Sequence, residues 1–568
     1  MTRLGGSSFA GRPAPAGGTP TSTRWSCRTP ARSTASSTTS SSRRCATGEP
    51  PSSPPTGPRN GSRRRLATAP RRSATGCWSR RPSRGGGHRS SPTSRSGSGL
   101  PARRSSRLPK WIGEHIVLDE RGAVAGLLRF ARELRWSDVP TPVRERTIQG
   151  VVDTVGVMLG GVDSDPSVRA QAVVARTEGT GVVRPVGIDR AVSWASAAWL
   201  SGISGHALDY DDTHWVTILH GSNPTLAAAL AVADGSGAVT GEKLLTAYLA
   251  GFEVAARVAR SMPTEHYSRG WHITGSTGGI GAAVAASRLL ESDAPTLTMA
   301  VAHAANTGSG HRQHFGSNAK PVNSGNAGRN GLVAALLAQQ GFDADPAGIE
   351  GRVGFWRVMC DVPEPGALVD GLGSTWEMLG NGIKPYPCGV VSHPALAGTE
   401  RLLGNGTLAS DIDSVELLVH PLVVELTGKD SLHSDHDVKF SIRTLVALTC
   451  QGHGRDVTAY SAEFVRSRPE VRELFGRISV TASDRLGTDQ AVVTITRKDG
   501  TRAVEKVETT PGSPADPISW EVLRDKFTRL IAARGISPEQ AALAFGRLRD
   551  VETLPDVSVF TGTRVFAQ

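Results

Sequence analysis

The chain has 568 residues, with 64 lysines and arginines against 52 aspartates and glutamates, so its formal net charge is +12. Residues 1–110 carry 22 of the basic residues and one acid, Glu49, whereas the remaining 458 residues carry a net charge of −9. The positive charge therefore belongs to the first fifth of the chain, and it does not make the rest a basic, nucleic-acid-binding protein.

Residues 1–115 form the first predicted region. Up to residue 110 the sequence has no Val, Ile, Tyr, Asp or Gln and only four Leu, so it cannot bury enough apolar surface to offset the entropy of ordering. We expect disorder there, and two interpretations stay open. The region is a basic arm that contacts nucleic acid through phosphates, or it is not natively translated, because a GC-rich gene in another frame gives this composition. Three aromatic residues and no binding-module motif make nucleic acid an unlikely partner.

The remaining composition indicates a soluble, cytoplasmic protein. No run of about 18 apolar residues is present, so we expect no membrane span. The six cysteines include no Cys-x-x-Cys pair, which argues against a zinc ribbon, a thioredoxin-type pair and a typical iron–sulfur cluster. Cysteine usage of this kind fits a reducing compartment.

A helical domain is predicted over residues 116–383. Apolar residues recur at helical spacing from Val124 to Leu134 and from Ile148 to Leu159. Further segments are rich in Ala and Gly and long enough for helices: around 195–208, 225–233, 242–260, 281–290 and 331–340. Small residues let helices approach closely, so these segments predict a multi-helix bundle.

After Lys384 the apolar period shortens toward two, which is typical of strands. Residues 415–419 alternate, and a second run through Val493 and Ile495 reaches Asp499-Gly500, a strong hairpin turn. These patterns predict a smaller α+β domain over 384–514. Helical signals return in the C-terminal region, 515–568, at 519–531 and after a capping-box pattern at 537–540.

Four stretches of the helical region and the domain junction concentrate polar side chains. The first runs from His206 through Asp209-Tyr210-Asp211-Asp212-Thr213 to His220, and its imidazoles and carboxylates invite metal ligation. Its spacing matches no known metal site, so we expect no metal. The alternative is structural, with Asp211 or Asp212 capping a turn and His206 packed in the core.

The second stretch is Trp271-His272 followed by a glycine-rich run. No apolar strand precedes these glycines, so a dinucleotide-binding loop is excluded, and a closely packed helix entry is favoured. A histidine there could exchange protons near neutral pH.

The third and fourth stretches hold Lys320-Pro321 and Lys384-Pro385. Lysines before proline are usually solvated, but their Gly/Asn/Ser and Pro/Tyr/Cys surroundings favour fixed loops.

With these four motifs in order, the chain from about Val124 to Phe560 resembles the MmgE/PrpD family, which includes 2-methylcitrate dehydratase, cis-aconitate decarboxylase and iminodisuccinate epimerase. The resemblance implies a mainly α fold, in which a large all-helical domain has a smaller α+β lid domain inserted before its C-terminal helices. It also implies a homodimer that uses no cofactor.

The resemblance implies site residues as well. The catalytic set is Asp209, His220, His272, Lys320 and Lys384, and the substrate-binding set is Asp212, Thr213 and Tyr386. Two positions depart from the family pattern. Gly221 stands where the family usually has Pro, and Thr444 stands where many members have the Tyr of a Pro-Tyr pair. The missing tyrosine leaves the identity of the substrate open.

The shared chemistry of the family is proton transfer at a carbon next to a carboxylate. Two lysines supply positive charge where negative charge develops, and two histidines supply the acid and base. We expect a cofactor-independent lyase that dehydrates a 2-methylcitrate-like acid. The alternatives are decarboxylation or epimerisation of a related polycarboxylate in the same pocket, and a catalytically silent family member.

Overall fold

The computed structural model describes residues 122–567 apart from Pro263. The prediction made for residues 1–115 lies outside this range. Within it, no helix is both long enough and apolar enough to cross a membrane.

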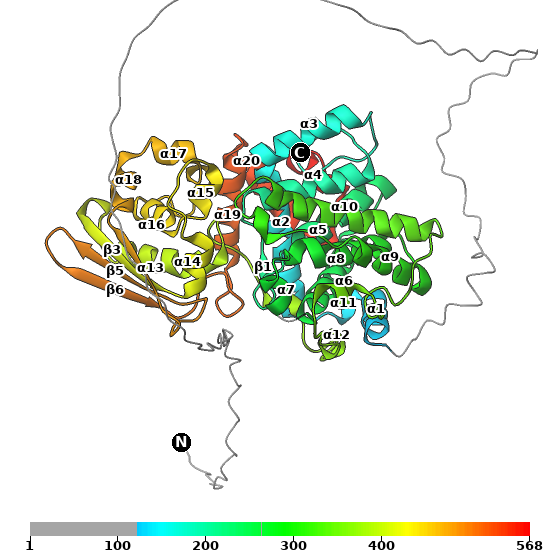
Figure 1. Ribbon diagram of the computed structural model, residues 1–568. Coiled ribbons are helices and arrows are strands. Elements are labelled where there is room, and N and C mark those ends of the chain that lie inside the picture. The colour runs from blue at the N-terminus through cyan, green and yellow to red at the C-terminus, as the bar shows by residue number, and fades with distance from the viewer. Residues whose placement is uncertain (1–121, 263, 568) are drawn as a thin grey trace, which may run out of the picture. The chain divides into compact units, whose positions relative to one another are not determined.

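Twelve helices between residues 123 and 369 build most of the described chain (Figure 1). Their apolar faces share one hydrophobic core. The helices are α1 (Ala123–Glu133), α2 (Thr141–Gly161), α3 (Asp165–Thr177), α4 (Trp194–Ala207), α5 (Ser222–Ser236), α6 (Gly241–Arg260), α7 (Thr264–Ser268), α8 (Ile273–Leu289), α9 (Ala294–Asn306), α10 (Ala319–Gln339), α11 (Phe355–Met359) and α12 (Gly366–Val369).

The centre of this bundle depends on glycine. Helix α8 packs against α5, α6 and α10, and the backbones of α6 and α8 meet at Gly251 and Gly281. A Cβ on Gly251 would lie 2.5 Å from the Gly281 carbonyl oxygen, and one on Gly281 would lie 2.6 Å from the Gly251 carbonyl oxygen. Real Cβ atoms do not approach backbone so closely, so the Ala- and Gly-rich composition is what brings these helices together.

The smaller α+β part has its own hydrophobic core, between Tyr386 and Ile495. Its sheet has the strand order β4-β3-β5-β6, in which β3 and β4 are parallel and the other pairs are antiparallel. The strands are β3 (Ile412–Val419), β4 (Ile478–Ala482), β5 (Ala491–Arg497) and β6 (Arg502–Val507). The helices are α13 (His393–Gly404), α14 (Pro421–Thr427), α15 (Asp435–Lys439), α16 (Ile442–Cys450), α17 (Ala462–Arg466) and α18 (Pro469–Phe475).

After the sheet the chain returns to the helical part. Helix α19 (Trp520–Ala532) packs on α2, and α20 (Pro538–Arg549) begins at the capping box formed by Ser537 and Gln540. Residues of both helices belong to the first hydrophobic core. The predicted mainly α fold with a smaller α+β part is therefore confirmed. The exact boundaries at 383/384 and 514/515 stay predictions.

Candidate active site

The turn after α4 places an aspartate in an unusual backbone conformation. Helix α4 ends at Ala207, and Asp209 follows with a φ of 54°, in the left-handed region that few residues other than glycine adopt. Such strain persists only where surrounding contacts hold it. Lys384 supplies two of these contacts, because its Nζ donates to the Asp209 carbonyl oxygen (3.0 Å) and to its carboxylate Oδ1 (2.7 Å).

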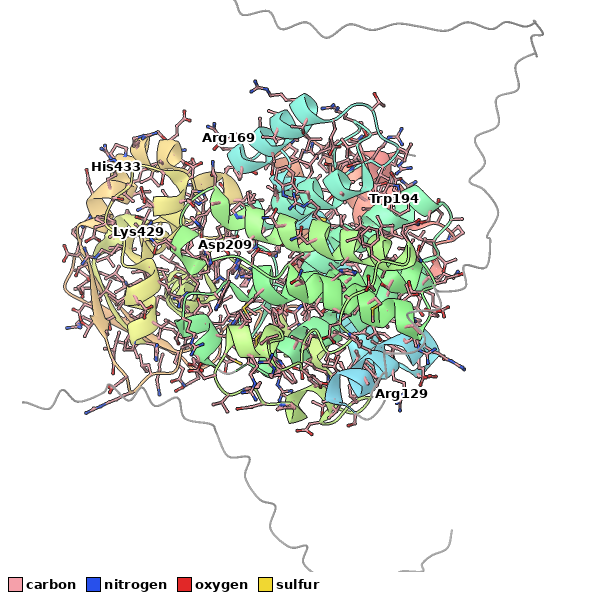
Figure 2. All side chains as sticks on the ribbon, turned by 45° about the vertical axis from the view of Figure 1, so that its right-hand side comes forward. Arg129, Arg169, Trp194, Asp209, Lys429 and His433 are labelled. Atoms are coloured by element: carbon pink, nitrogen blue, oxygen red, sulfur yellow. The ribbon has the colours of Figure 1, made fainter. Side chains whose placement is uncertain are left out.

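A second lysine completes this ion-pair group. Lys320 Nζ lies 2.9 Å from Asp209 Oδ2, so one carboxylate is shared by two ammonium groups. Lys320 is in the first turn of α10, not in the loop that the sequence predicted, whereas Lys384 does lie in a loop, shortly after strand β2 (Asn381–Gly382). All three side chains are buried. In Figure 2, Asp209 lies where the yellow α+β elements meet the green helices.

The electrostatics of the group follow from this geometry. Burial alone would raise the pKa of Asp209, but Lys320 and Lys384 outweigh it and hold that pKa well below its usual value. Burial would likewise lower the pKa of Lys384, yet Asp209 and Asp211 raise it above its ordinary value. Asp209 and Lys384 are therefore both charged at neutral pH, and two lysines face one carboxylate.

Three histidines lie together beside the ion-pair group. His206 comes from the end of α4, His220 precedes α5, and His272 directly precedes α8. Ring centroids are 4.8 Å apart for His206 and His220, 5.5 Å for His206 and His272, and 6.3 Å for His220 and His272. The first and second motifs of the sequence thus meet in space.

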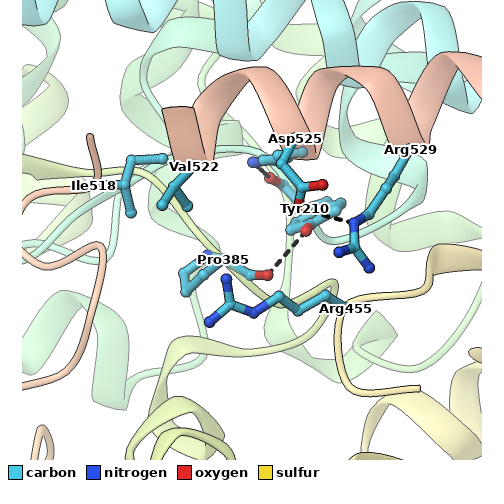
Figure 3. A pocket seen from close by; sticks show the side chains of 8 residues that line it. Tyr210, Pro385, Arg455, Ile518, Val522, Asp525 and Arg529 are labelled. Carbon is cyan, nitrogen blue, oxygen red and sulfur yellow. Dashed lines mark hydrogen bonds and ion pairs between the residues drawn. The ribbon is translucent and has the colours of Figure 1, made fainter. Parts of the chain in front are cut away.

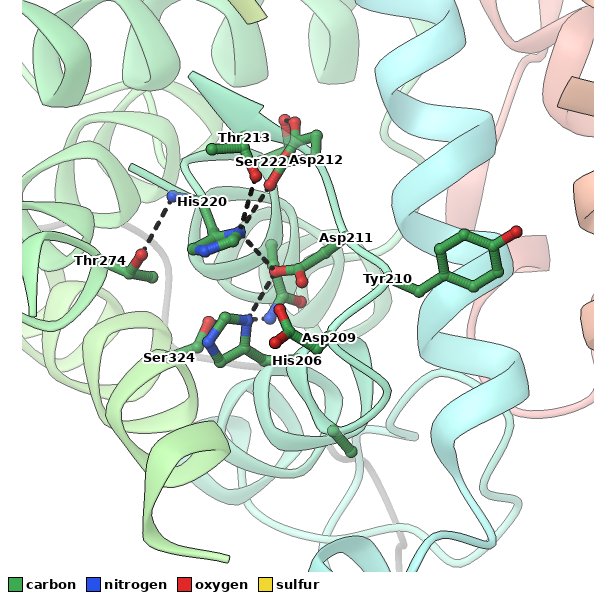
Figure 4. Close-up of polar contacts among 12 residues, drawn as sticks. His206, Asp209, Tyr210, Asp211, Asp212, Thr213, His220, Ser222, Thr274 and Ser324 are labelled. Atoms are coloured by element: carbon green, nitrogen blue, oxygen red, sulfur yellow. Dashed lines mark hydrogen bonds and ion pairs between the residues drawn. The ribbon is translucent and has the colours of Figure 1, made fainter. Parts of the chain in front are cut away.

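Each ring has a fixed partner on Nδ1. His206 Nδ1 contacts Asp211 Oδ2 at 2.7 Å, and His220 Nδ1 lies 2.6 Å from the Asp212 carbonyl oxygen (Figure 4). Because a carbonyl oxygen only accepts, neutral His220 carries its hydrogen on Nδ1 and leaves Nε2 as an acceptor. His272 Nδ1 lies 3.1 Å from the amide nitrogen of Asn323.

Burial keeps two of these rings neutral. It lowers the pKa of His220 to about 3, although Asp211 opposes the shift, and it lowers that of His272 well below the ordinary value. The positive charge of Lys320 acts in the same direction on both rings. Two neutral imidazoles beside two ammonium groups can accept or relay a proton at physiological pH.

The three imidazoles are also the residues that could hold a metal ion. Nitrogen atoms of His206, His220 and His272 lie within 4.8 Å of one another, and partners on Nδ1 are typical of metal-ligating histidines. However, the positive potential of Lys320 that lowers the pKa of His272 also disfavours a second cation beside it. The expectation of no metal stays a prediction.

The predicted substrate-binding residues are placed differently from one another. Thr213, in strand β1 (Thr213–His214), has its Oγ1 3.4 Å from His220 Nδ1 and so borders the histidines. Asp212 faces the other way, where Oδ2 accepts from Ser222 and Asn381, and burial raises its pKa to about 7. Through these two hydrogen bonds its carboxylate joins the turn after α4 to Ser222 and Asn381.

Tyr386 is buried within the core of the α+β part. Its hydroxyl donates to Glu400 Oε2 at 2.8 Å, and Arg455 lies over its ring. Its ring also packs edge-on against His393, and among the described residues none of these contacts is with Asp209, His220 or His272, so the structure does not bring Tyr386 together with the other predicted residues. Its predicted role in binding stays a prediction.

Several residues at the site were not predicted from sequence. His206 and Asp211 were given structural roles, yet they pair with each other and contact the ring of His220. Asn323 orients His272, and Lys439 reaches the end of α4 from the α+β part. The clustering of Asn323 near Lys320 in the third motif was a usable signal. Lys439 begins the Lys-Phe-Ser segment that leads to Thr444 and is part of the resemblance, but no role was predicted for it, because a single lysine is usually solvated.

Of the two departures from the family pattern, the structure explains Gly221. A Cβ there would lie 2.9 Å from Cε2 of Phe252, whose ring is fully buried, so glycine fits this chain's own packing. Thr444 is buried in the first turn of α16, where its hydroxyl donates to Ser441 at 2.9 Å.

A small cavity lies behind the site, between α19 and the α+β part (Figure 3). Its lining residues are Tyr210, Pro385, Arg455, Ile518, Val522, Asp525, Lys526 and Arg529. Tyr210 points away from the histidines into this region, and its hydroxyl donates to the Pro385 carbonyl oxygen. The charged residues around the cavity already have partners: Arg455 pairs with Glu400, Lys526 with Asp153 and Arg529 with Asp525.

These features define a helical protein with a buried set of acid-base groups where an α+β part meets the bundle. The chain belongs to the MmgE/PrpD family, whose N-terminal domain matches residues 125–367 and whose C-terminal domain matches residues 386–547.

Curated relatives of the chain are enzymes. Cis-aconitate decarboxylase of Homo sapiens is 25% identical over 384 residues, which cover 64% of this chain and 78% of the relative. Cis-aconitate decarboxylase of Aspergillus terreus is 24% identical over 468 residues, which cover 76% of this chain and 95% of the relative. The family and its lyase-type members thus agree with the sequence resemblance, without separating dehydration from decarboxylation.

Proposed function

We propose that the protein is a lyase of small di- or tricarboxylic acids that transfers a proton at a carbon next to a carboxylate. The observation that carries the proposal is the meeting of Lys320, Lys384 and Asp209 with the neutral imidazoles of His220 and His272. The lysines supply the positive charge that a carbanion-like transition state needs, in a buried site where such charge acts strongly. The histidines supply the proton acceptor and donor.

The hydrogen bonds suggest a division of labour between the two histidines. His220 keeps its hydrogen on Nδ1, so its Nε2 is the base. His272 accepts on Nδ1 from the Asn323 amide, so its hydrogen is on Nε2, which is buried without a protein partner among the described residues and is free to donate. A bound polyanion raises the pKa of both rings toward neutrality, which improves their match to proton transfer.

Decarboxylation is the first candidate reaction, because the curated relatives are cis-aconitate decarboxylases. The bond between the carboxylate carbon and the rest of the substrate breaks, and carbon dioxide leaves. The electron pair stays on the substrate, delocalised over a neighbouring double bond and stabilised by Lys320 and Lys384. His272, protonated while the polyanion is bound, then gives its proton to this carbon to form the new C–H bond and returns to the neutral imidazole.

Dehydration of a 2-methylcitrate-like acid is the second candidate, because an acceptor and a donor lie side by side in His220 and His272. His220 removes the proton next to the carboxylate, the electron pair forms the double bond, and the C–O bond breaks. With the polyanion bound, His272 is the protonated imidazolium; it gives one proton to the leaving hydroxyl, which departs as water, and the ring returns to neutral. Epimerisation would need only the removal and return of the first proton.

A substrate panel tests the proposal. Cis-aconitate, citrate, 2-methylcitrate and iminodisuccinate are incubated with the full chain, and carbon dioxide release, water loss and change of optical rotation are followed. His272→Ala and Lys320→Ala should abolish turnover, while the exposed controls His433→Ala and Lys498→Ala should retain it. Turnover of no acid, or unchanged turnover in His272→Ala, contradicts the proposal.

The homodimer also stays a prediction, which light scattering tests.

A further inference from the structure

A third lysine reaches the site from the α+β part. Lys439 ends the short helix α15 and is only 7% exposed. Its Nζ donates to the carbonyl oxygen of Ala207 at 3.2 Å, two residues before Asp209. Lys439 therefore joins the α+β part to the end of α4 at the point where the ion-pair group begins.

Lys439 differs from the other buried lysines in its partners. Lys320 and Lys384 share Asp209, and Lys526 has Asp153. Among residues 122–567 apart from Pro263, Lys439 has no carboxylate within ion-pair distance, and the Ala207 carbonyl is the one acceptor found for its three donors. Buried charges are normally paired, so this ammonium group lacks its anion.

The neighbouring groups do not neutralise Lys439. Asp209 is already shared by two lysines, and Asp435 Oδ1 accepts from the backbone N–H of Ala462 at 2.8 Å. His436 contacts Asn318 through Nε2 at 3.0 Å, and burial lowers its pKa to about 4, so it is neutral. Burial also raises the pKa of the Cys388 thiol, which is neutral too.

The charge on Lys439 nevertheless persists near neutral pH. Burial lowers its pKa to about 8, and Lys320 adds to the shift, whereas Asp209 and Asp435 oppose it. Three ammonium groups thus converge on the Asp209 turn, where Asp209 pairs directly with two of them and Asp211 adds a second negative charge, so positive charge stays in excess. An anionic ligand with several carboxylates is the chemistry that balances this excess.

We propose that Lys439 binds a carboxylate of the substrate, as a third cation beside Lys320 and Lys384, and so selects acids with three carboxylates over acids with two. The inference rests on the proposed function and names its substrate class. Lys439 holds the third carboxylate where the α+β part meets the end of α4, because its Nζ already donates to the Ala207 carbonyl oxygen there. Lys439 is a binding residue, and no proton transfer is assigned to it.

The test compares two unreactive ligands that differ by one carboxylate. Tricarballylate is glutarate with an additional central carboxylate, and calorimetry on the full chain measures the affinity of each. Wild-type protein should bind tricarballylate more tightly than glutarate. Lys439→Met should weaken tricarballylate roughly 10- to 100-fold, as loss of a charge-assisted contact does, with much less change for glutarate. Lys439→Arg should keep most of the preference, and the exposed Lys498→Met should keep all of it.

A measurement on the wild-type protein covers the case in which Lys439→Met does not fold. Tricarballylate affinity should fall above about pH 8 as Lys439 loses its proton, and Lys439→Arg should remove this fall. Equal weakening of both ligands in Lys439→Met, or an alkaline fall that persists in Lys439→Arg, overturns the inference. Binding without turnover separates the two proposals. If the protein prefers tricarballylate to glutarate through Lys439 but converts no acid, only the proposed lyase activity is refuted. If it converts an acid but shows no such preference, only the inference about Lys439 is refuted.

Discussion

Two buried lysine–aspartate groups lie on either side of the turn at Tyr210, and they differ in their charge balance. On one side Lys526 pairs with Asp153 and donates to the Tyr210 carbonyl oxygen, so one cation meets one anion. Burial there raises the pKa of Asp153 and lowers that of Lys526. On the other side two lysines share Asp209, and the pKa shifts of Asp209 and Lys384 run in the opposite directions.

We infer that this difference separates a structural pair from the proposed binding site. In a balanced buried pair the two charges neutralise each other. Removing one partner leaves the other as a buried charge without a counter-charge, which destabilises the fold. A group with more cations than anions is complete only when a ligand supplies the missing negative charge. Lysine and aspartate therefore have different roles in the two groups. The number of lysines per aspartate distinguishes these roles better than the burial of the side chains does.

The largest expected effect is on stability at the balanced pair. Lys526→Met leaves Asp153 buried without its cation, and the free energy of unfolding should fall by about 3–5 kcal/mol. Urea titration at pH 7 measures this loss. The double variant Lys526→Met/Asp153→Leu should recover much of it, because both charges are then gone. A single variant as stable as wild type would show that the pair does not support the fold.

The matching change at the site should act on turnover instead. Lys384→Met leaves Asp209 paired with Lys320, so the fold keeps one balanced pair, but the reacting carbon loses one stabilising charge. We expect kcat/KM to fall roughly 10²- to 10³-fold, the effect typical of losing one such group. Steady-state kinetics measure it, with Lys498→Met as control. An unchanged kcat/KM together with a large loss of stability would reverse the distinction between the two groups.

A third buried aspartate sharpens the contrast, because no cation within residues 122–567 apart from Pro263 forms an ion pair with Asp212. Burial raises its pKa to about 7, so it binds a proton in the folded protein at pH values where the unfolded chain has lost it. The native state is therefore destabilised progressively from about pH 4 to pH 7. Asp212→Asn removes this dependence. Its gain in stability over wild type should therefore be about 2–3 kcal/mol larger at pH 8 than at pH 5. Urea titrations at both pH values test this, and an equal effect at each would contradict it.

The sequence predicted the fold class and most helices, but it placed Lys320 in a loop. The segment that follows Lys320 is rich in Gly, Asn and Ser, which are poor helix formers, yet it forms α10. Packing explains the difference. A Cβ on Gly325 would lie 2.7 Å from the Trp199 carbonyl oxygen of α4, so small residues are required where α10 meets its neighbour. Tertiary contact outweighed local propensity at this helix.

The site was predictable where its residues cluster along the chain. The four motifs gave Asp209, His220, His272, Lys320 and Lys384, and the structure brings these five side chains together. Pairing across the fold was not predictable in the same way. The structural interpretation of His206 was reasonable for a lone histidine in an apolar helix, and only its contact with Asp211 shows that it supports the site.

The smallest expected effect concerns Gly221, which follows His220 directly. In Gly221→Ala the new Cβ would lie 2.9 Å from Cε2 of Phe252 and 3.2 Å from Leu219 Cδ2, so this region of the core becomes overpacked. We expect a loss of about 1–3 kcal/mol in stability, measured by urea titration. Because His220 is the neighbouring residue, kcat should fall more than KM changes.

Phe252→Leu in the Gly221→Ala background tests whether that contact is the cause. The smaller side chain removes the ring that the new Cβ meets, so part of the lost stability should return, while Phe252→Leu alone should destabilise by leaving a cavity. Additive losses in the double variant would show that Gly221 is required for another reason. Recovery of stability together with kcat would instead show that the fit between Gly221 and Phe252 positions His220 against the Asp209 group.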